Sequence, residues 1–188
     1  MKLLTMMLTA VALVAGSSLC MAEETKSGLQ TGEMIGAFYV TKLAGASEDG
    51  VDVGKNLCYR CKNGGRPQVI VFTRTGDKQV VDLVQQLDKA IAANEDKQLR
   101  SFVNYLGDEK ASAKADAEKL AKTVTADNVP IVLPNEFENG PENYGINPKA
   151  EVTIILAKGG EVKANFAATS AKDLKVDAVI AGLEKILN

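Results

Sequence analysis

The sequence of 188 residues contains no histidine, no tryptophan and only three cysteines. Without an imidazole, the chain cannot build a Ser-His-Asp triad, a Cys-His protease site or a zinc site with histidine ligands. Its 22 basic and 24 acidic residues are interspersed, so it lacks the basic stripe that marks nucleic-acid-binding proteins. These absences exclude histidine-based hydrolysis and predict no nucleic-acid partner.

Residues 1–22 have the pattern of a secretory signal peptide. Lys2 gives a positive start, a run of about 13 almost wholly apolar residues follows, and a Gly-Ser-Ser sequence ends the run. Cleavage after Ala22 would leave small side chains, those of Ala22 and Cys20, at the two positions that the peptidase recognises. We therefore expect a mature chain that begins at Glu23 and is periplasmic or secreted.

A lipid anchor or a membrane-spanning helix would give a different location, and neither fits these residues. A lipoprotein signal has a small residue directly before its cysteine, whereas the bulky Leu19 precedes Cys20. The apolar run of about 13 residues is shorter than the roughly 20 residues that a spanning helix needs. The sequence therefore predicts no integral membrane segment after cleavage.

Beyond the leader, residues 23–34 are polar and without periodicity, and we expect a flexible segment there. Residues 35–188 have the length of a single domain. Residues 69–72, Val-Ile-Val-Phe, form a continuous apolar run of the kind found in a strand buried on both faces. The other patterns predict, in chain order, a hairpin of strands 38–43 and 51–53, helix 79–93, strand 99–106, helix 110–122, strand 129–133, a hairpin of strands 152–157 and 162–166 around paired glycines, and helix 173–187.

This order of elements, β-α-β-α-β and then β-β-α, resembles the thioredoxin fold. It is closest to the redoxin or peroxiredoxin-like branch, which carries an N-terminal hairpin. Residues 67–72 are similar to the first central strand of redoxins, and residues 144–146 with 152–162 resemble the late strand, glycine turn and strand of that family. The resemblance implies an α/β domain in which a mixed sheet is flanked by helices and extended by an N-terminal β-hairpin.

Two cysteines remain after cleavage, Cys58 and Cys61, in a Cys-Tyr-Arg-Cys motif, and a disulfide is their expected state in an oxidising compartment. The resemblance would place such a pair after the first central strand, at a helix N-terminus. This chain has Thr-Arg-Thr-Gly-Asp there, at residues 73–77. The family's cis-proline would fall near residues 150–151, and the nearest proline is Pro148. The motif is therefore displaced, away from the helix terminus that normally activates the attacking cysteine.

Cys58 and Cys61 are the candidate catalytic residues, and two interpretations of them stay open. Their displacement favours a structural disulfide in a non-catalytic binding or scaffold domain. The alternative is a thiol–disulfide oxidoreductase or redox sensor, in which the resemblance makes Cys58 the attacking cysteine. Nearby cations would favour a thiolate. They are Lys55, Arg60, Lys62 and Arg66. The expected partner is another envelope or secreted protein.

No cofactor or metal site is predicted. Two thiolates cannot complete a four-ligand zinc site, and Lys62 stands where the covalent haem motif Cys-x-x-Cys-His needs its histidine. Glu136, Glu138 and Glu142 lack the alternating Asp/Asn spacing of a calcium-binding loop. We expect them to form a solvated acidic loop.

Overall fold

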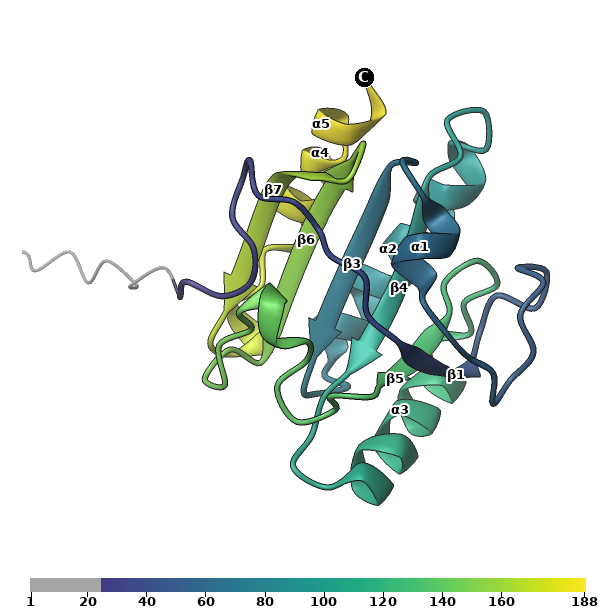
Figure 1. The fold of residues 1–188 in the computed structure, drawn as a ribbon, viewed down its shortest axis with the longest axis vertical. Coiled ribbons are helices and arrows are strands. Elements are labelled where there is room, and N and C mark those ends of the chain that lie inside the picture. Colours follow the sequence, from purple (N-terminus) through teal and green to yellow (C-terminus); the bar gives the residue numbers. More distant parts are fainter. Residues whose placement is uncertain (1–24) are drawn as a thin grey trace, which may run out of the picture.

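A computed structural model describes residues 25–188 of the protein. Its centre is a seven-stranded mixed sheet with the order β2-β1-β5-β4-β3-β6-β7 (Figure 1). The strands are β1 (Val40–Ala44), β2 (Asn56–Leu57), β3 (Gln68–Thr73), β4 (Arg100–Tyr105), β5 (Ile131–Pro134), β6 (Val152–Lys158) and β7 (Glu161–Ala168). The helices are α1 (Tyr59–Asn63), α2 (Lys78–Ala93), α3 (Lys110–Val124), α4 (Val176–Gly182) and α5 (Glu184–Leu187), with 3-10 turns at Glu142–Tyr144 and Ala171–Asp173. The expected signal peptide lies outside the described residues.

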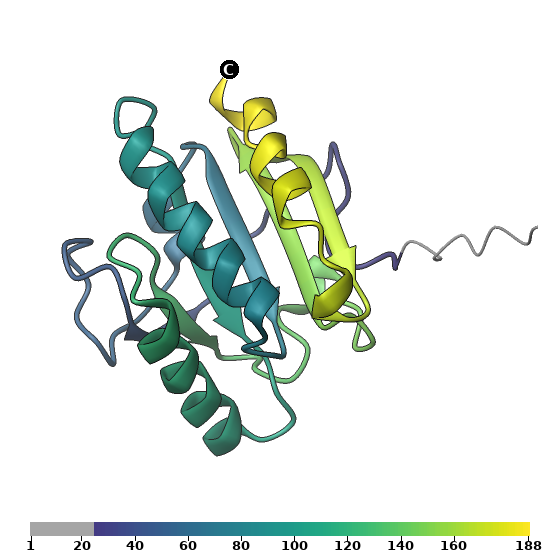
Figure 2. The same cartoon turned by 180° about the vertical axis from the view of Figure 1, so that it is seen from behind.

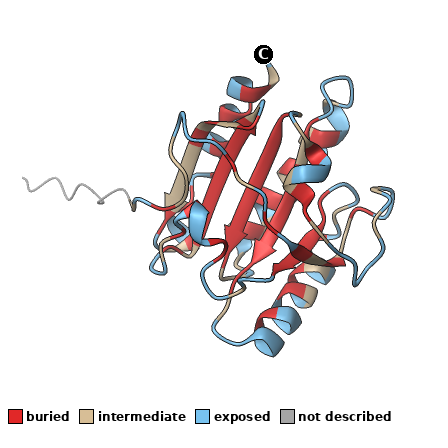
Figure 3. Cartoon of the chain, in the orientation of Figure 1, coloured by how far each residue is buried: buried red, intermediate tan, exposed pale blue. Residues whose placement is uncertain are grey.

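The apolar run at residues 69–72 forms the centre of the sheet, as predicted. β3 pairs in parallel with β4 and antiparallel with β6, and all six of its residues are buried. Val69 and Val71 belong to the hydrophobic cluster on one face, and Ile70 and Phe72 to the cluster on the other. A strand covered on both faces has no polar side to alternate with, which explains its continuous apolar sequence (Figure 3).

α2, α3, α4 and α5 all cover one face of the sheet, called here the back face (Figure 2). α2 places an apolar stripe on it, in which Val80, Leu83, Val84 and Leu87 are fully buried. α3 contacts the sheet through small and branched residues at helical spacing, and most of its lysines stay exposed. The predicted C-terminal helix is divided, because a 3-10 turn precedes it and Leu183 separates α4 from α5.

The front face is covered by α1 and by residues 25–39, which cross before β7, β6 and β3 (Figure 1). The expected flexibility of residues 23–34 stays a prediction, but the described part of this segment makes specific contacts with the sheet. Ser27 is 2% exposed, and the Asn165 amide donates to the carbonyl groups of Ser27 and Leu29 at 2.9 and 2.8 Å. Gly32 N donates to the carbonyl oxygen of Val162, whose own N–H donates to Glu33. The segment lacks regular structure, but the edge strand β7 satisfies its backbone groups.

The N-terminal hairpin exists, but its second strand differs from the prediction. β1 pairs with Asn56–Leu57, whereas residues 51–53 lie in the connecting loop. Lys42 explains the difference, because its buried ammonium donates to Ala46 O, Val51 O and Asp49 Oδ1 and so draws the loop inward. The other side of β1 pairs with β5, which also pairs with β4, so β5 lies inside the sheet and begins directly after Pro130.

Candidate functional site

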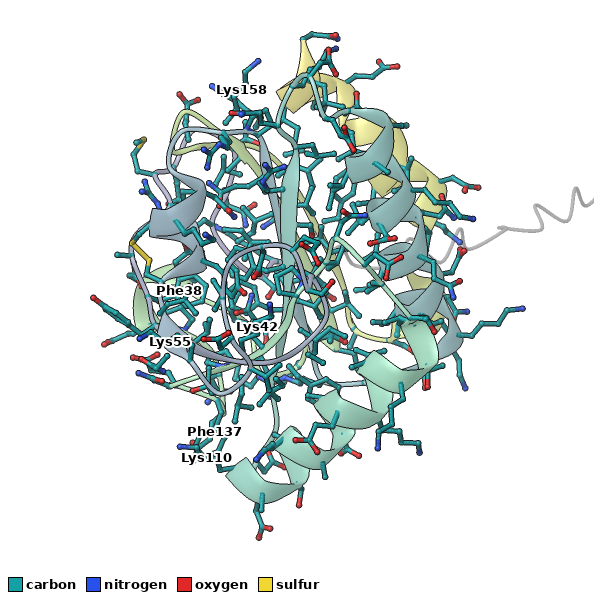
Figure 4. The ribbon with its side chains drawn as sticks, turned by 90° about the vertical axis from the view of Figure 1, so that its right-hand side faces the viewer. Phe38, Lys42, Lys55, Lys110, Phe137 and Lys158 are labelled. Carbon is teal, nitrogen blue, oxygen red and sulfur yellow. A yellow bond between two sulfur atoms is a disulfide. The ribbon has the colours of Figure 1, made fainter. Side chains whose placement is uncertain are left out.

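Cys58 and Cys61 form a disulfide at the first turn of α1, with Cα atoms 5.2 Å apart. Cys58 is the N-cap of the helix, and its Sγ accepts the backbone N–H of Cys61 at 3.0 Å. The two cysteines differ in exposure, since Cys58 is only 8% exposed whereas Cys61 is an exposed residue. In Figure 4 the disulfide and α1 lie on the opposite side of the sheet from α2.

The helix that carries the pair was not predicted from the sequence. α1 has only five residues, which is too short for an apolar periodicity. The signal that could have revealed it is Asn63-Gly64-Gly65, because Gly64 ends the helix with φ at 61° and its N–H donates to the carbonyl oxygens of Arg60 and Cys61. The motif therefore lies at a helix N-terminus after all, although not at the helix that follows β3.

Tyr59, between the two cysteines, anchors this loop in the hydrophobic cluster of the front face. Its ring stacks on Phe102 with centroids 5.6 Å apart, and its hydroxyl donates to Asp49 Oδ2 at 2.6 Å. The other carboxylate oxygen of Asp49 accepts the Lys42 ammonium at 2.8 Å, and Lys42 is only 1% exposed. Burial raises the pKa of Tyr59, and the hydrogen bond to Asp49 and its negative charge raise it further. The disulfide loop is thus tied to a buried ion pair.

The four cations expected near the pair are all in this region, and none forms an ion pair within residues 25–188. Arg60 Nε donates to the carbonyl oxygen of Ile35 at 3.1 Å, and this hydrogen bond ties α1 to the segment of residues 25–39 on the front face. Arg66 donates to Gln98 Oε1 at 3.1 Å and to the carbonyl oxygen of Lys62 at 3.2 Å. Among residues 25–188, the two cations next to Cys61 in the chain, Arg60 and Lys62, therefore have no paired anion.

Comparison with solved structures identifies the architecture. The thioredoxin domain of a thiol-disulfide oxidoreductase from Bacteroides vulgatus superimposes with a TM-score of 0.62 at 19% identity, covering 85% of this chain and 99% of that one. AhpC from Mycobacterium tuberculosis gives 0.61 at 14% identity, covering 83% and 92%. A putative thiol:disulfide interchange protein DsbE from Chlorobium tepidum gives 0.56 at 14%, covering 82% and 99%. The chain has a thioredoxin fold. No model of a known protein family matches it, and neither does any curated protein.

The place where the thioredoxin fold was expected to hold its cysteines contains an anchored arginine. Arg74, directly after β3, donates through Nη1 to Glu138 O at 2.7 Å and through Nη2 to Asn139 Oδ1 at 3.0 Å. Its own N–H donates to the carbonyl oxygen of Glu151, the residue before β6. Residues 25–188 contain no cis peptide bond, so the turn before β6 has no cis-proline. The turn after β3 is tied to the acidic loop and carries no thiol.

The acidic loop itself is solvated. Glu136, Glu138 and Glu142 are exposed, and within the described part of the chain no three Cys, Asp or Glu side chains gather as metal ligands would. None of the helices formed by residues 25–188 is both long and apolar enough to cross a membrane. Phe137, which the loop carries, packs partly buried against the back-face core.

Proposed function

We propose that the protein is an exported thiol–disulfide exchange protein that works through Cys58 and Cys61. The observation that carries the proposal is the unequal exposure of the two cysteines: Cys61 is an exposed residue, and Cys58 is a buried one whose Sγ accepts a hydrogen bond from Cys61 N–H. Solved structures of the same fold that are named as thiol-disulfide oxidoreductase or thiol:disulfide interchange proteins support it. Export rests on the pattern of residues 1–22, and the partner would be another envelope or secreted protein.

In the proposed reaction a partner thiolate attacks Cys61 Sγ. A partner–Cys61 disulfide forms, the Cys58–Cys61 bond breaks, and Cys58 leaves as a thiolate that the Cys61 N–H stabilises. A second partner thiolate then attacks the partner's sulfur in this mixed disulfide, which releases Cys61 as a thiolate and leaves the partner's two sulfurs bonded. Two electrons pass from the partner to the pair, and both released thiolates take protons from water. The reverse sequence reduces a partner disulfide, with Cys61 attacking.

This assignment reverses the order implied by the family resemblance, in which Cys58 attacks. To test it, the oxidised protein is treated with glutathione, quenched with N-ethylmaleimide and mapped by mass spectrometry. We expect glutathione on Cys61 and maleimide on Cys58, because Cys61 is the more exposed of the two residues and the attacking thiolate must reach its sulfur. Glutathione found mainly on Cys58 would contradict the assignment.

Activity is measured separately from the site of attack. The wild type should reduce insulin faster than the Cys58→Ser/Cys61→Ser variant, and each single serine variant should lose that excess rate. A wild type no faster than the double variant would show that the pair does not exchange with protein disulfides.

A non-catalytic binding domain with a structural disulfide is the second candidate, and one observation favours it. The turn after β3 carries no thiol and is held by two hydrogen bonds from Arg74 to the acidic loop. The reduction potential of Cys58–Cys61 distinguishes the candidates, because structural disulfides lie below about −300 mV and exchange-active ones above it. A value below that limit would favour the binding domain.

A further inference from the structure

An open concavity of about 570 Å³ lies beside α1, lined by residues 62–67 and by Lys97 and Gln98. We call it the basic groove, because its charged side chains are Lys62, Arg66 and Lys97 and none of its lining residues is acidic. Lys62, which lines the groove, directly follows Cys61 in the chain. The groove therefore begins one residue away from the exposed cysteine.

The positive charge of the groove is held in place and unpaired. Arg66 is fixed by its hydrogen bonds to Gln98 and to the backbone at Lys62, so its guanidinium is oriented before any partner arrives. None of the groove's three cations has an acidic partner within 4 Å among residues 25–188. Lys62 and Arg66 also line an adjoining hollow on the Tyr59 side, whose acidic lining residues are Glu48, Asp49, Glu95 and Asp127.

The groove differs in sign from the rest of the molecule. The whole chain has a formal net charge of −2, and the 14 residues from Gly54 to Pro67 include four cations and no acid. A concave surface with charge of one sign attracts oppositely charged partners and raises their rate of encounter by 10-fold or more at low ionic strength. A surface with this charge pattern favours thiols whose neighbouring residues are acidic.

We propose that the thiol that reacts with Cys61 is carried by an acidic peptide segment of a partner protein, and that this segment lies in the basic groove. The proposal rests on thiol exchange at Cys58–Cys61. Carboxylates of the segment pair with Lys62, Arg66 and Lys97, and the thiol between them meets Cys61 Sγ. The covalent steps are those given above, with the peptide sulfur forming the mixed disulfide and two peptide thiols ending as one peptide disulfide.

The test uses three capped pentapeptides of the form Xaa-Xaa-Cys-Xaa-Xaa, in which Xaa is Glu, Gln or Lys. The second-order rate constant for reduction of the oxidised protein is measured by maleimide quenching and mass spectrometry in 20 mM and 500 mM NaCl. Because neighbouring charges alter the reactivity of the peptide thiol itself, each rate constant is divided by that of the same peptide with neutral 2-hydroxyethyl disulfide.

We expect the Glu peptide to react roughly 10-fold faster than the Gln peptide at low salt, and the Lys peptide to be slowest. Salt at 500 mM should bring the Glu/Gln ratio close to one. The Lys62→Gln/Arg66→Gln/Lys97→Gln variant should lose the ratio even at low salt. A matched variant in α3, Lys110→Gln/Lys119→Gln/Lys122→Gln, removes the same charge from a helix on the back face. This variant should keep the Glu/Gln ratio of the wild type.

The two proposals fail in different ways. Equal normalised rates for the Glu and Gln peptides, or an equal loss of the ratio in both triple variants, would overturn the groove and leave thiol exchange standing. A disulfide that none of the three peptides reduces would overturn thiol exchange itself.

Discussion

Replacing Tyr59 with phenylalanine removes a single hydroxyl from the middle of the disulfide loop. That hydroxyl donates to Asp49 Oδ2 at 2.6 Å, while Asp49 Oδ1 accepts from Lys42 Nζ and from Val51 N at 2.8 Å each. The phenylalanine ring would keep the stacking on Phe102. The variant therefore isolates one hydrogen bond that links the Cys-x-x-Cys loop to a buried ion pair.

The expected magnitude follows from the surroundings of the carboxylate. A hydrogen bond to a charged group contributes about 1.5–3 kcal/mol to stability. The Asp49 side chain keeps Lys42 and is 17% exposed, so water can reach the vacated oxygen, which points to the lower end of that range, about 1.5 kcal/mol. In a domain of this size the melting temperature should fall by roughly 3–6 °C.

Thermal unfolding of the oxidised protein, followed by circular dichroism, measures this loss. Tyr39→Phe is the matched control, because Tyr39 is 57% exposed and a surface change of this kind should stay within about 0.5 kcal/mol. A Tyr59→Phe melting temperature equal to that of the control would refute the reasoning, since the phenol would then contribute nothing to holding the loop.

Three further outcomes are expected. The Cys58→Ser/Cys61→Ser variant should fold and lose about 2 kcal/mol, the chain-entropy value for so short a loop, which lowers the melting temperature by roughly 4–8 °C in calorimetry. Burial raises the pKa of Tyr105 to about 12, above the value of about 10 in an unfolded chain. The unfolded state therefore releases this proton first, and the stability difference between the wild type and Tyr105→Phe should fall by about 1.4 kcal/mol per pH unit from pH 10 to 12, measured as urea midpoints of both proteins at each pH. The comparison removes the contributions of Tyr59 and Tyr144, whose pKa values burial also raises. Protein recovered from the host envelope or medium should begin at Glu23 in N-terminal sequencing, and an intact leader would contradict export.

Elements with long periodic patterns were predictable from the sequence, since burial on one or two faces determines their residues. The strand at residues 69–72, the α2 stripe and the Gly159-Gly160 hairpin all occur where their patterns place them. Both glycines have positive φ, 65° and 86°, which the turn between β6 and β7 requires. In these elements the local sequence pattern and the tertiary packing favour the same structure, so the pattern alone was enough to predict them.

The front layer was less predictable because distant side chains determine it. Residues 25–34 have no periodicity, and their place on the sheet depends on the Asn165 amide and the edge of β7, more than 100 positions later. The second hairpin strand was misplaced because the loop is drawn in by the Lys42 ammonium, and a lone lysine in a sequence gives no sign of burial. In both cases a polar group satisfied by tertiary contacts overrides the local pattern.

For the candidate site, the sequence predicted the chemistry but not the geometry. The disulfide between Cys58 and Cys61 occurs as expected, because they are the only cysteines among residues 25–188 and lie three positions apart. Which sulfur faces solvent depends on how α1 lies on the sheet, and Tyr59 decides this by turning toward Phe102 and Asp49. A helix of five residues gives no pattern from which that orientation could be inferred.

The two layers of the molecule are held in different ways, and this bears on how the pair can work. Helices shorter than about 12–15 residues are marginal on their own, so α1 depends on three anchors: the buried Tyr59, the bond from Arg60 Nε to Ile35 O, and the disulfide. The back-face cluster, which holds α2 and α3, shares no residue with the front-face cluster. Opening the disulfide therefore removes one anchor of a short front helix and leaves the sheet and its long helices packed. This separation follows from the position of the motif on a short helix before the central strand rather than at the start of the long helix after it.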